Sequence, residues 1–195
     1  MLVKKEIEAC FIEGERAFGR PVNVLLNNAG IQETKMFFEN PAHPSWKRVV
    51  DIDLTAVIEG TGIAIERWTK GGVQGVVINT ASQGGLIEMP FSPVYSAAKH
   101  GVVGFSRSCG ILQNYGIRVN CICPDFVDTP MVHSSLSDPT FKSVIDGMKG
   151  KGISLITPEL VADGMIQLIE DDTKSGQVLR VNSVKGIHHK LYGKL

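Results

Sequence analysis

The chain has 195 residues, of which 43% are hydrophobic and 21% are charged, which suits one domain with a substantial buried core. Its 20 basic and 20 acidic residues cancel, so neither nucleic acid nor an anionic membrane is an expected partner. No apolar run approaches the ~20 residues that span a bilayer, and the charged start MLVKKEIEACF lacks the apolar stretch of an export signal.

The cysteines and histidines give no sign of a metal site. The four cysteines follow no metal-ligand spacing, and Cys121 and Cys123 face the same side of a predicted strand, which favours buried thiols over ligands. His188 and His189 have no evident partner ligands, and we expect them to be solvated residues of the tail. Free thiols fit the reducing cytoplasm. The final GKL differs by one residue from the Ser-Lys-Leu peroxisomal address and does not change that expectation.

Apolar periodicity and turn residues predict an alternation of helices and strands along the chain. In chain order, we expect a helix over residues 3–19, a strand over 22–27, a helix over 45–68, a strand over 75–81, a helix from 93 to about 114, a strand over 117–123, a short helix near 139–149, a helix over 157–172 and a strand over 176–182. The apolar stripe of the first helix consists of Ile7, Cys10, Phe11, Ala17 and Phe18, and Gly19 closes that helix.

Capping residues mark three of the expected helix starts. Ser45 is expected as an N-cap, because its hydroxyl can accept a backbone N–H of the first turn. Pro93 falls in a first turn, where its missing N–H costs nothing. Thr157 is expected as the N-cap of the last helix.

Strands that alternate with helices form parallel sheets covered by helices on both faces. We therefore expect an α/β fold, a Rossmann-like three-layer sandwich over residues 1–195 whose parallel sheet has about four strands. The strand over 22–27 is apolar like an interior strand, yet no strand precedes it, so it would lie at a sheet edge of the kind that natural folds cover. We interpret this pattern as an N-terminal truncation of a longer single domain.

Polar and glycine-rich stretches follow three of the predicted strands at their carboxyl ends. They are NNAG (27–30), SQGG (82–85) and PDFVDTPM (124–131), which together we call the rim. In open α/β sheets, ligands bind in the crevice beyond the carboxyl ends of the strands. Tyr95 and Lys99 lie one turn apart in the helix after SQGG, so they overhang the same rim.

The pairing of Tyr95 with Lys99 suggests proton transfer. A free phenol has a pKa of ~10, and an adjacent ammonium favours the phenolate. Lowering that pKa to ~7 requires about 4 kcal/mol, which one close cation and a second positive charge in a dry cleft would supply. Taken alone, a Tyr-x-x-x-Lys pair is more often a surface pair or a snorkelling lysine, and Ser82 alone is more often a turn hydroxyl. Their shared placement at the rim favours an active site.

These residues resemble the short-chain dehydrogenase/reductase family. The match rests on NNAG, on Ser82 thirteen residues before Tyr95, on YSAAK and on PDFVDT, and it extends over essentially the whole chain. The resemblance implies that Ser82 positions the substrate oxygen, that Tyr95 is the general base or acid, and that Lys99 binds the nicotinamide ribose and lowers the pKa of Tyr95. The cofactor site that it implies consists of Asn28, Ala29, Gly30, Tyr95, Lys99, Pro124 and Thr129.

The chain departs from the family pattern at several places. Asp53 stands at a catalytic position where the family has an asparagine that supports a water-mediated proton relay, and a carboxylate there competes for the charge of Lys99. Asp125 stands where the family has a glycine beside the cofactor. The glycine-rich loop that binds the pyrophosphate is absent, together with the acidic residue that selects NAD over NADP. Ser92 stands where an NAD-linked branch of the family has a substrate-contacting glutamine, so the resemblance implies no particular substrate.

The resemblance implies an enzyme that interconverts a secondary alcohol and a ketone with NAD, with NADP left open. Its partners would then be a small-molecule alcohol or ketone and a second copy of the chain, paired through the helices that start near residues 45 and 93. The alternative is a catalytically silent homologue that keeps the dimer-forming helices but cannot hold a cofactor, since the phosphate-binding loop is absent.

Overall fold

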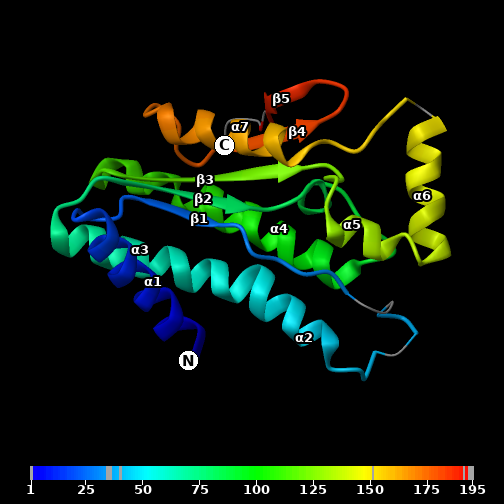
Figure 1. The fold of residues 1–195 in the computed structure, drawn as a ribbon, viewed down its shortest axis with the longest axis horizontal. Coiled ribbons are helices and arrows are strands. Elements are labelled where there is room, and N and C mark those ends of the chain that lie inside the picture. The colour runs from blue at the N-terminus through cyan, green and yellow to red at the C-terminus, as the bar shows by residue number, and fades with distance from the viewer. Residues whose placement is uncertain (1, 34–36, 40, 151, 191, 193–195) are drawn as a thin grey trace.

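A five-stranded sheet forms the centre of the molecule (Figure 1). The computed structural model describes every residue except 1, 34–36, 40, 151, 191 and 193–195, so the GKL ending lies outside the described residues. The strands are β1 (Val24–Asn27), β2 (Gly75–Thr80), β3 (Ile117–Pro124), β4 (Val178–Asn182) and β5 (Gly186–His189), and they lie in this order across the sheet. Strands β1 to β4 are parallel, as expected, whereas β5 is antiparallel to β4.

Strand β5 corrects one expectation about the C-terminal region. His188 and His189 lie in a strand, opposite Arg180 and Leu179 of β4, rather than in a solvated tail. His188 is half-buried and His189 is exposed. Gly186 has a φ of 63°, which a glycine adopts without strain as the chain turns back beside β4. The alternation of helices and strands gave no indication of a hairpin at this position.

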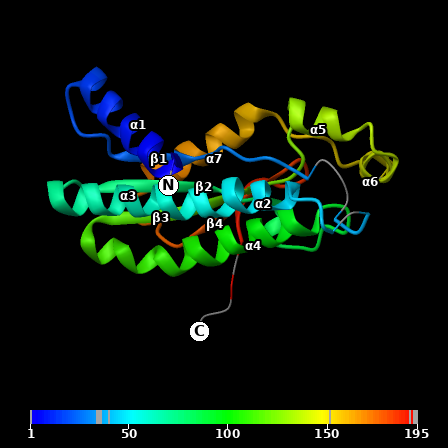
Figure 2. The ribbon, with the colours of Figure 1, turned by 90° about the horizontal axis from the view of Figure 1, so that it is seen from below.

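Helices cover both faces of the sheet, which completes the three layers. They are α1 (Leu2–Phe18), α2 (Ser45–Val50), α3 (Ala56–Gly71), α4 (Pro93–Ser108), α5 (Pro130–Ser135), α6 (Pro139–Gly150) and α7 (Pro158–Glu170). Helices α2 and α3 form one long rod that runs beside α4 (Figure 2). Helices α5 and α6 lie beyond the carboxyl ends of the strands (Figure 1). The sequence did not predict α5, a helix of only six residues.

Several helix boundaries differ from the expected ones. Pro44, not Ser45, is the N-cap of α2, and the Ser45 hydroxyl lies 2.9 Å from Nδ1 of His43. The helix that starts at residue 93 gives way at residue 109 to a 3-10 turn, Cys109–Tyr115. Thr157 is confirmed as a cap, because its hydroxyl accepts the backbone N–H of Leu160 at 3.3 Å.

The rod formed by α2 and α3 contains one wider turn. Residues Asp51–Thr55 adopt a π-helical conformation between the two α-helical segments. A π turn holds one residue more per hydrogen-bonded ring than an α turn, and such turns are rare and concentrate at functional sites. Asp53 lies in the middle of this turn.

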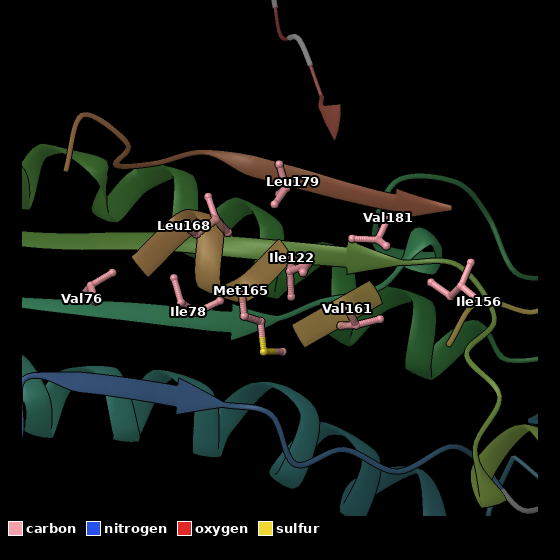
Figure 3. Packing of buried hydrophobic residues seen from close by; sticks show 9 residues of the cluster. All are labelled: Val76, Ile78, Ile122, Ile156, Val161, Met165, Leu168, Leu179 and Val181. Carbon is pink, nitrogen blue, oxygen red and sulfur yellow. The ribbon is translucent and has the colours of Figure 1, made fainter. Parts of the chain in front are cut away.

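Helix α7 buries one face of the sheet. Its Val161, Met165 and Leu168 recur at helical spacing and pack on residues of three neighbouring strands (Figure 3). Those strand residues include Ile78 of β2 and Ile122 of β3, both without exposed surface. Strands buried on both faces are apolar throughout, which explains the continuous apolar runs of β2 and β3.

Helices α3 and α4 bury the opposite face of the sheet. Trp68 of α3 is the largest buried side chain, and its indole N–H donates to the carbonyl of Val22 at 2.7 Å. A Cβ on Gly75 would lie 2.5 Å from the Trp68 ring, so β2 begins with the residue that admits the indole. Phe11 of α1 meets the Trp68 ring edge-on, with 6.5 Å between centroids.

The predicted apolar stripe of α1 is only partly buried. Phe11 is buried and Ile7 is half-buried, whereas Cys10, Ala17 and Phe18 are exposed. A helix that packs on one neighbouring helix buries a narrower stripe than a helix that lies on a sheet. The end of α1 is as predicted: Gly19 has a φ of 63° and donates its N–H to the carbonyl of Glu15 at 2.9 Å.

Strand β1 lies at an edge of the sheet, as the sequence predicts, and Leu26 is 44% exposed there. A polar network fixes this strand against its neighbours. The Asn27 amide donates to Oδ1 of Asn79 at 2.8 Å and to the Thr61 hydroxyl at 3.2 Å, and the Asn79 amide donates to the Ser106 hydroxyl at 2.9 Å. These bonds join β1 and β2 to α3 and α4 near the carboxyl ends of the two strands.

The expectation of buried thiols in β3 is confirmed. Cys121 and Cys123 are both fully buried on the same side of β3. Among the described residues, no group of histidine, cysteine and acidic side chains has the arrangement of a metal site. No helix within the described part of the chain has the length and apolarity to cross a membrane.

Candidate active site

Ser82, Tyr95 and Lys99 come together at the rim. Ser82 begins the turn after β2, where its hydroxyl accepts the N–H of Gly84 at 3.1 Å. Tyr95 lies in the first turn of α4 and hydrogen-bonds with the Ser82 side chain. The Lys99 ammonium lies one turn further on, 5.5 Å from the centroid of the Tyr95 ring. The phenol therefore has a hydroxyl partner and a cation within reach, as the sequence predicts.

The Lys99 ammonium is more tightly engaged with Asp53 than with the phenol. Its Nζ lies 3.1 Å from Oδ2 of Asp53 and donates to the carbonyl of Thr80 at 3.0 Å. Both members of the ion pair are buried, with 3% of the Lys99 side chain and none of the Asp53 side chain exposed. The expectation that a carboxylate at position 53 competes for the charge of Lys99 agrees with this geometry.

The pKa of Tyr95 moves in the direction opposite to the one expected from the sequence. Burial raises this pKa to about 12, a hydrogen bond with Ser82 lowers it, and the charge of Asp53 raises it further. Lys99 itself is paired with Asp53 at close range. The expected lowering combined Lys99 with a second positive charge, so it remains a prediction for the site with its cofactor.

Asp53 has a raised pKa of its own. Burial is the largest cause, while Lys99 and the backbone N–H of Ile31 act in the other direction. The Ile31 N–H donates to Oδ1 at 2.8 Å, which ties the segment after β1 to the π turn. A Cβ on Gly30 would lie 3.1 Å from Oδ2 of Asp53 and 3.4 Å from Nζ of Lys99, so the absence of a side chain at residue 30 leaves room beside the pair.

The other residues expected at a cofactor site lie along the rim. Asn28 and Ala29 are exposed, and Oδ1 of Asn28 accepts the Thr80 hydroxyl at 3.0 Å. Pro124 is buried at the end of β3. Thr129 precedes α5 in an extended conformation, and its hydroxyl donates to the carbonyl of Val127 at 3.3 Å.

Asp125, the other acidic departure from the family pattern, is half-buried at the carboxyl end of β3. Its backbone N–H donates to the carbonyl of Val181 at 2.9 Å. Burial raises the pKa of this carboxyl, while the charges of Arg180 and His188 act against the rise. The side chain therefore has basic neighbours on β4 and β5.

The sequence did not point to two further polar residues that lie beside the candidate site, Gln32 and Glu33. The two carboxylate oxygens of Glu33 accept the backbone N–H groups of Val94 and Tyr95, both at 3.0 Å. The Gln32 amide donates to the Ser92 hydroxyl at 2.9 Å and accepts from the Ser135 hydroxyl at 3.2 Å. Both polar residues follow NNAG almost immediately, and this continuation of the rim segment was the available signal.

A cavity of about 410 Å³ opens beside these residues. Its lining includes Gly30 and Gln32 from the segment after β1, Ser92 before α4, Ser135 of α5 and Phe141 of α6. It therefore lies between the rim and the two helices beyond the carboxyl ends of the strands. Gly30 connects it to the Asp53–Lys99 pair.

Comparisons with known proteins identify the family of the chain. A family model described as short chain dehydrogenase matches residues 3–140. The chain belongs to the short chain dehydrogenase family.

Two relatives are named 15-hydroxyprostaglandin dehydrogenase, with NAD(+) as part of the name. The Bos taurus protein is 38% identical over 187 residues, which cover 90% of this chain and 66% of the relative. The Homo sapiens protein is 37% identical over 185 residues, with the same two shares. The chain thus spans about two thirds of the length of these relatives.

Solved structures share the fold over nearly the whole chain. An actinorhodin polyketide ketoreductase with NADPH has a TM-score of 0.81 at 31% identity, covering 94% of this chain and 74% of that one. Levodione reductase has a TM-score of 0.80 at 28% identity, covering 94% and 73%. The Rossmann-like α/β architecture is therefore shown by both sheet topology and structural likeness.

Proposed function

We propose that residues 1–195 form one catalytic domain of a nicotinamide-dependent oxidoreductase that interconverts a secondary alcohol and a ketone. The observation that carries the proposal is the convergence of Ser82, Tyr95 and Lys99 on one rim. The names of the relatives, all dehydrogenases or reductases, support the same reaction class.

Each of the three side chains has a role that its contacts permit. The Tyr95 hydroxyl gives a proton to the substrate oxygen or takes one from it. The Ser82 hydroxyl, which already hydrogen-bonds with the phenol, holds the same oxygen. An ammonium has three N–H donors. One N–H of Lys99 donates to the carbonyl of Thr80 and a second points at the Asp53 carboxylate, so the third is left for a ribose hydroxyl. The nicotinamide, when bound, gives or takes the hydride at the substrate carbon.

The residues at the rim fit the nicotinamide and ribose end of such a cofactor. Gly30 carries no side chain where a Cβ would crowd Asp53 and Lys99, which leaves space beside the ammonium. Asn28 and Ala29 are exposed next to it, and Thr129 begins the segment across the crevice. We propose NAD because the two 15-hydroxyprostaglandin dehydrogenases described above bear it in their names, with NADP as the alternative.

The cavity supplies the substrate side of the site. Its hydroxyl and amide groups come from Gln32, Ser92 and Ser135, and its apolar wall includes Phe91 and Phe141. Such a lining suits a small molecule that carries polar groups as well as an apolar part. Gln32 places an amide against Ser92, three residues before the tyrosine, and we propose that it contacts the substrate there.

We propose that the protein acts as a homodimer in the cytoplasm. The outward surfaces of α3 and α4 support pairing, because Ile58 is 42% exposed and a Cβ on Gly62 or Gly104 would meet nothing within 4 Å. Glycines on an outer helix face let two helices approach closely. Light scattering on the purified chain tests the assembly.

Calorimetry with NAD tests the proposal directly. Submillimolar binding supports the oxidoreductase, whereas no binding at millimolar NAD favours the catalytically silent homologue that keeps only the pairing helices. If the chain turns over a secondary alcohol or ketone, Tyr95→Phe should lower kcat roughly 100- to 10,000-fold and leave NAD binding intact. Tyr115→Phe is the matched control, because that tyrosine is 76% exposed outside the site.

A further inference from the structure

Asp53 lies without any exposed surface beneath the rim. The π turn Asp51–Thr55 carries it, and its Oδ1 accepts the Ile31 N–H at 2.8 Å. Its Oδ2 lies 3.1 Å from the Lys99 ammonium and has no hydrogen-bond partner elsewhere in the described part of the chain. An ionised carboxylate that is buried needs a counter-charge. Lys99 is the counter-ion of Asp53.

The same pairing limits what Lys99 can do for Tyr95. A lone ammonium 5.5 Å from the Tyr95 ring would stabilise the phenolate strongly in a buried site. With a carboxylate 3.1 Å from the ammonium, the two opposite charges largely cancel at the phenol. The Asp53–Lys99 pair therefore produces little net positive electrostatic potential at the Tyr95 hydroxyl.

Among the described residues, the other groups that act on Tyr95 do not restore that potential. The electrostatic effect of Cys123 of β3 raises the pKa of Tyr95. Glu33 sits at the backbone of the same turn, where Oε2 accepts the Tyr95 N–H. Ser82 offers a neutral hydroxyl. The pKa of Tyr95 is correspondingly raised, to about 12, mainly by burial and in part by Asp53.

We propose that Asp53, by pairing with Lys99, keeps Tyr95 as a neutral phenol, so that the site is set to donate a proton to a carbonyl oxygen rather than to accept one from an alcohol. This inference rests on the proposed function and assigns the protonation state of Tyr95 at neutral pH, which is the state that ketone reduction uses. Asp53 acts on the reaction through Lys99 and Tyr95 and is a positioning residue.

The proton and the electrons balance in that direction. A reduced nicotinamide is the electron source, and its hydride adds to the carbonyl carbon. The O–H bond of Tyr95 breaks, and its proton bonds to the carbonyl oxygen to complete the alcohol. The tyrosinate left behind recovers a proton from water. The reverse reaction needs the phenolate first and is therefore favoured by alkaline pH.

Titration of the phenol tests the proposal without cofactor or substrate. Tyrosinate absorbance is recorded against pH. The Tyr95 contribution is isolated by subtracting the matching Tyr95→Phe curve, because the chain has two further tyrosines, Tyr115 and Tyr192. Asp53→Asn keeps the size of the side chain and an oxygen for the Ile31 N–H. It should move the Tyr95 midpoint down by about 1 to 2 pH units, the effect expected of an unpaired ammonium at this distance.

Asp51→Asn is the matched control. Asp51 lies on the same π turn but is exposed, so removing its charge should leave the Tyr95 midpoint in place. A midpoint that stays fixed or rises in a folded Asp53→Asn chain overturns the proposal. An equal fall in both variants also overturns it, since the effect would then be one of general charge.

The double variant Asp53→Asn with Lys99→Met covers the case in which the single variant does not fold. Replacing a buried ion pair by uncharged residues is often tolerated, whereas stranding one charge is not. If the pair cancels at the phenol, the midpoint in the double variant should stay within about half a unit of the parent value. A rise of more than about one unit would show that Lys99 stabilises the phenolate despite its pairing, and the proposal fails.

A kinetic measurement separates this inference from the proposed function. If the chain turns over, the pH profile of alcohol oxidation should report the deprotonation of Tyr95, and Asp53→Asn should move the midpoint of that profile down by the same number of pH units as the titration midpoint. If the chain binds no NAD, the proposed function fails while the titration still decides the state of Tyr95. A pH profile that does not move in an active Asp53→Asn enzyme overturns the inference alone.

Discussion

Replacing Glu33 with glutamine should destabilise the chain by roughly 2 kcal/mol, because Glu33 caps the helix that carries Tyr95 and Lys99. The first turn of α4 has few other partners for its backbone. Pro93 has no N–H, and the Ser92 side chain makes no capping bond. The carboxylate of Glu33 accepts both remaining N–H groups, those of Val94 and Tyr95, at 3.0 Å each.

The magnitude follows from what glutamine retains. Its one amide oxygen can still accept one N–H, so one charge-assisted bond is lost, at about 1 to 2 kcal/mol. The favourable contact between a negative charge and the positive end of the helix is lost as well, at about 0.5 to 1 kcal/mol. Glu33→Ala removes both bonds and should cost about 1 kcal/mol more than Glu33→Gln.

Urea unfolding followed by circular dichroism measures these differences, with the slope m expected to stay constant. Glu159→Gln is the matched control. Glu159 lies exposed in the first turn of α7, where Thr157 already caps the helix, so only the dipole effect of about 0.3 to 1 kcal/mol should be lost. If Glu33→Gln costs no more than Glu159→Gln, the two hydrogen bonds from Glu33 to the first turn of α4 contribute no stability beyond the effect of its charge. That result would refute the prediction.

Two further predictions concern buried groups. Arg118→Met should cost roughly 3 to 5 kcal/mol in the same urea assay. Arg118 is only 8% exposed, and its guanidinium donates to four carbonyls in the last turn of α7 and the segment after it, those of residues 168, 169, 171 and 174. A loss below 1 kcal/mol would contradict that role. The raised pKa of Tyr95 implies that stability from the protonated phenol is complete below pH ~10 and is lost as pH rises through about 12. The loss amounts to about 2 to 3 kcal/mol, so Tyr95→Phe should flatten the fall in unfolding free energy above pH ~10, and a fall equally steep in the variant would count against the shift.

The sequence alone determined the architecture and the place of the site. Apolar runs of strand length alternating with amphipathic segments can bury their faces only as a parallel sheet between helices, which the structure shows in β1 to β4. Because parallel strands end at one edge, Ser82, Tyr95 and Lys99 had to meet there once Tyr95 and Lys99 shared a helix face. The spacing of Tyr95 and Lys99 on one helix and the common direction of the strands were therefore enough to predict where the site lies.

Two short elements could not be predicted from the sequence, because they are too short to show a periodic pattern. Helix α5 has six residues and β5 has four, too few for a period to appear. The hairpin that forms β5 depends on pairing with β4, and the exposure of Phe18 depends on where α1 meets α3. Both are decided by neighbours, not by the segment itself.

Only the tertiary structure decided the charge state of the site. From the sequence, Lys99 beside Tyr95 predicted a lowered phenol pKa, and the family resemblance predicted that Asp53 competes for the charge of Lys99. Folding buries Asp53 against the ammonium and brings Glu33 to the Tyr95 N–H from 62 positions away. A pKa depends on burial and on every charge within a few ångströms in space, and these distances exist only once the segments are packed together.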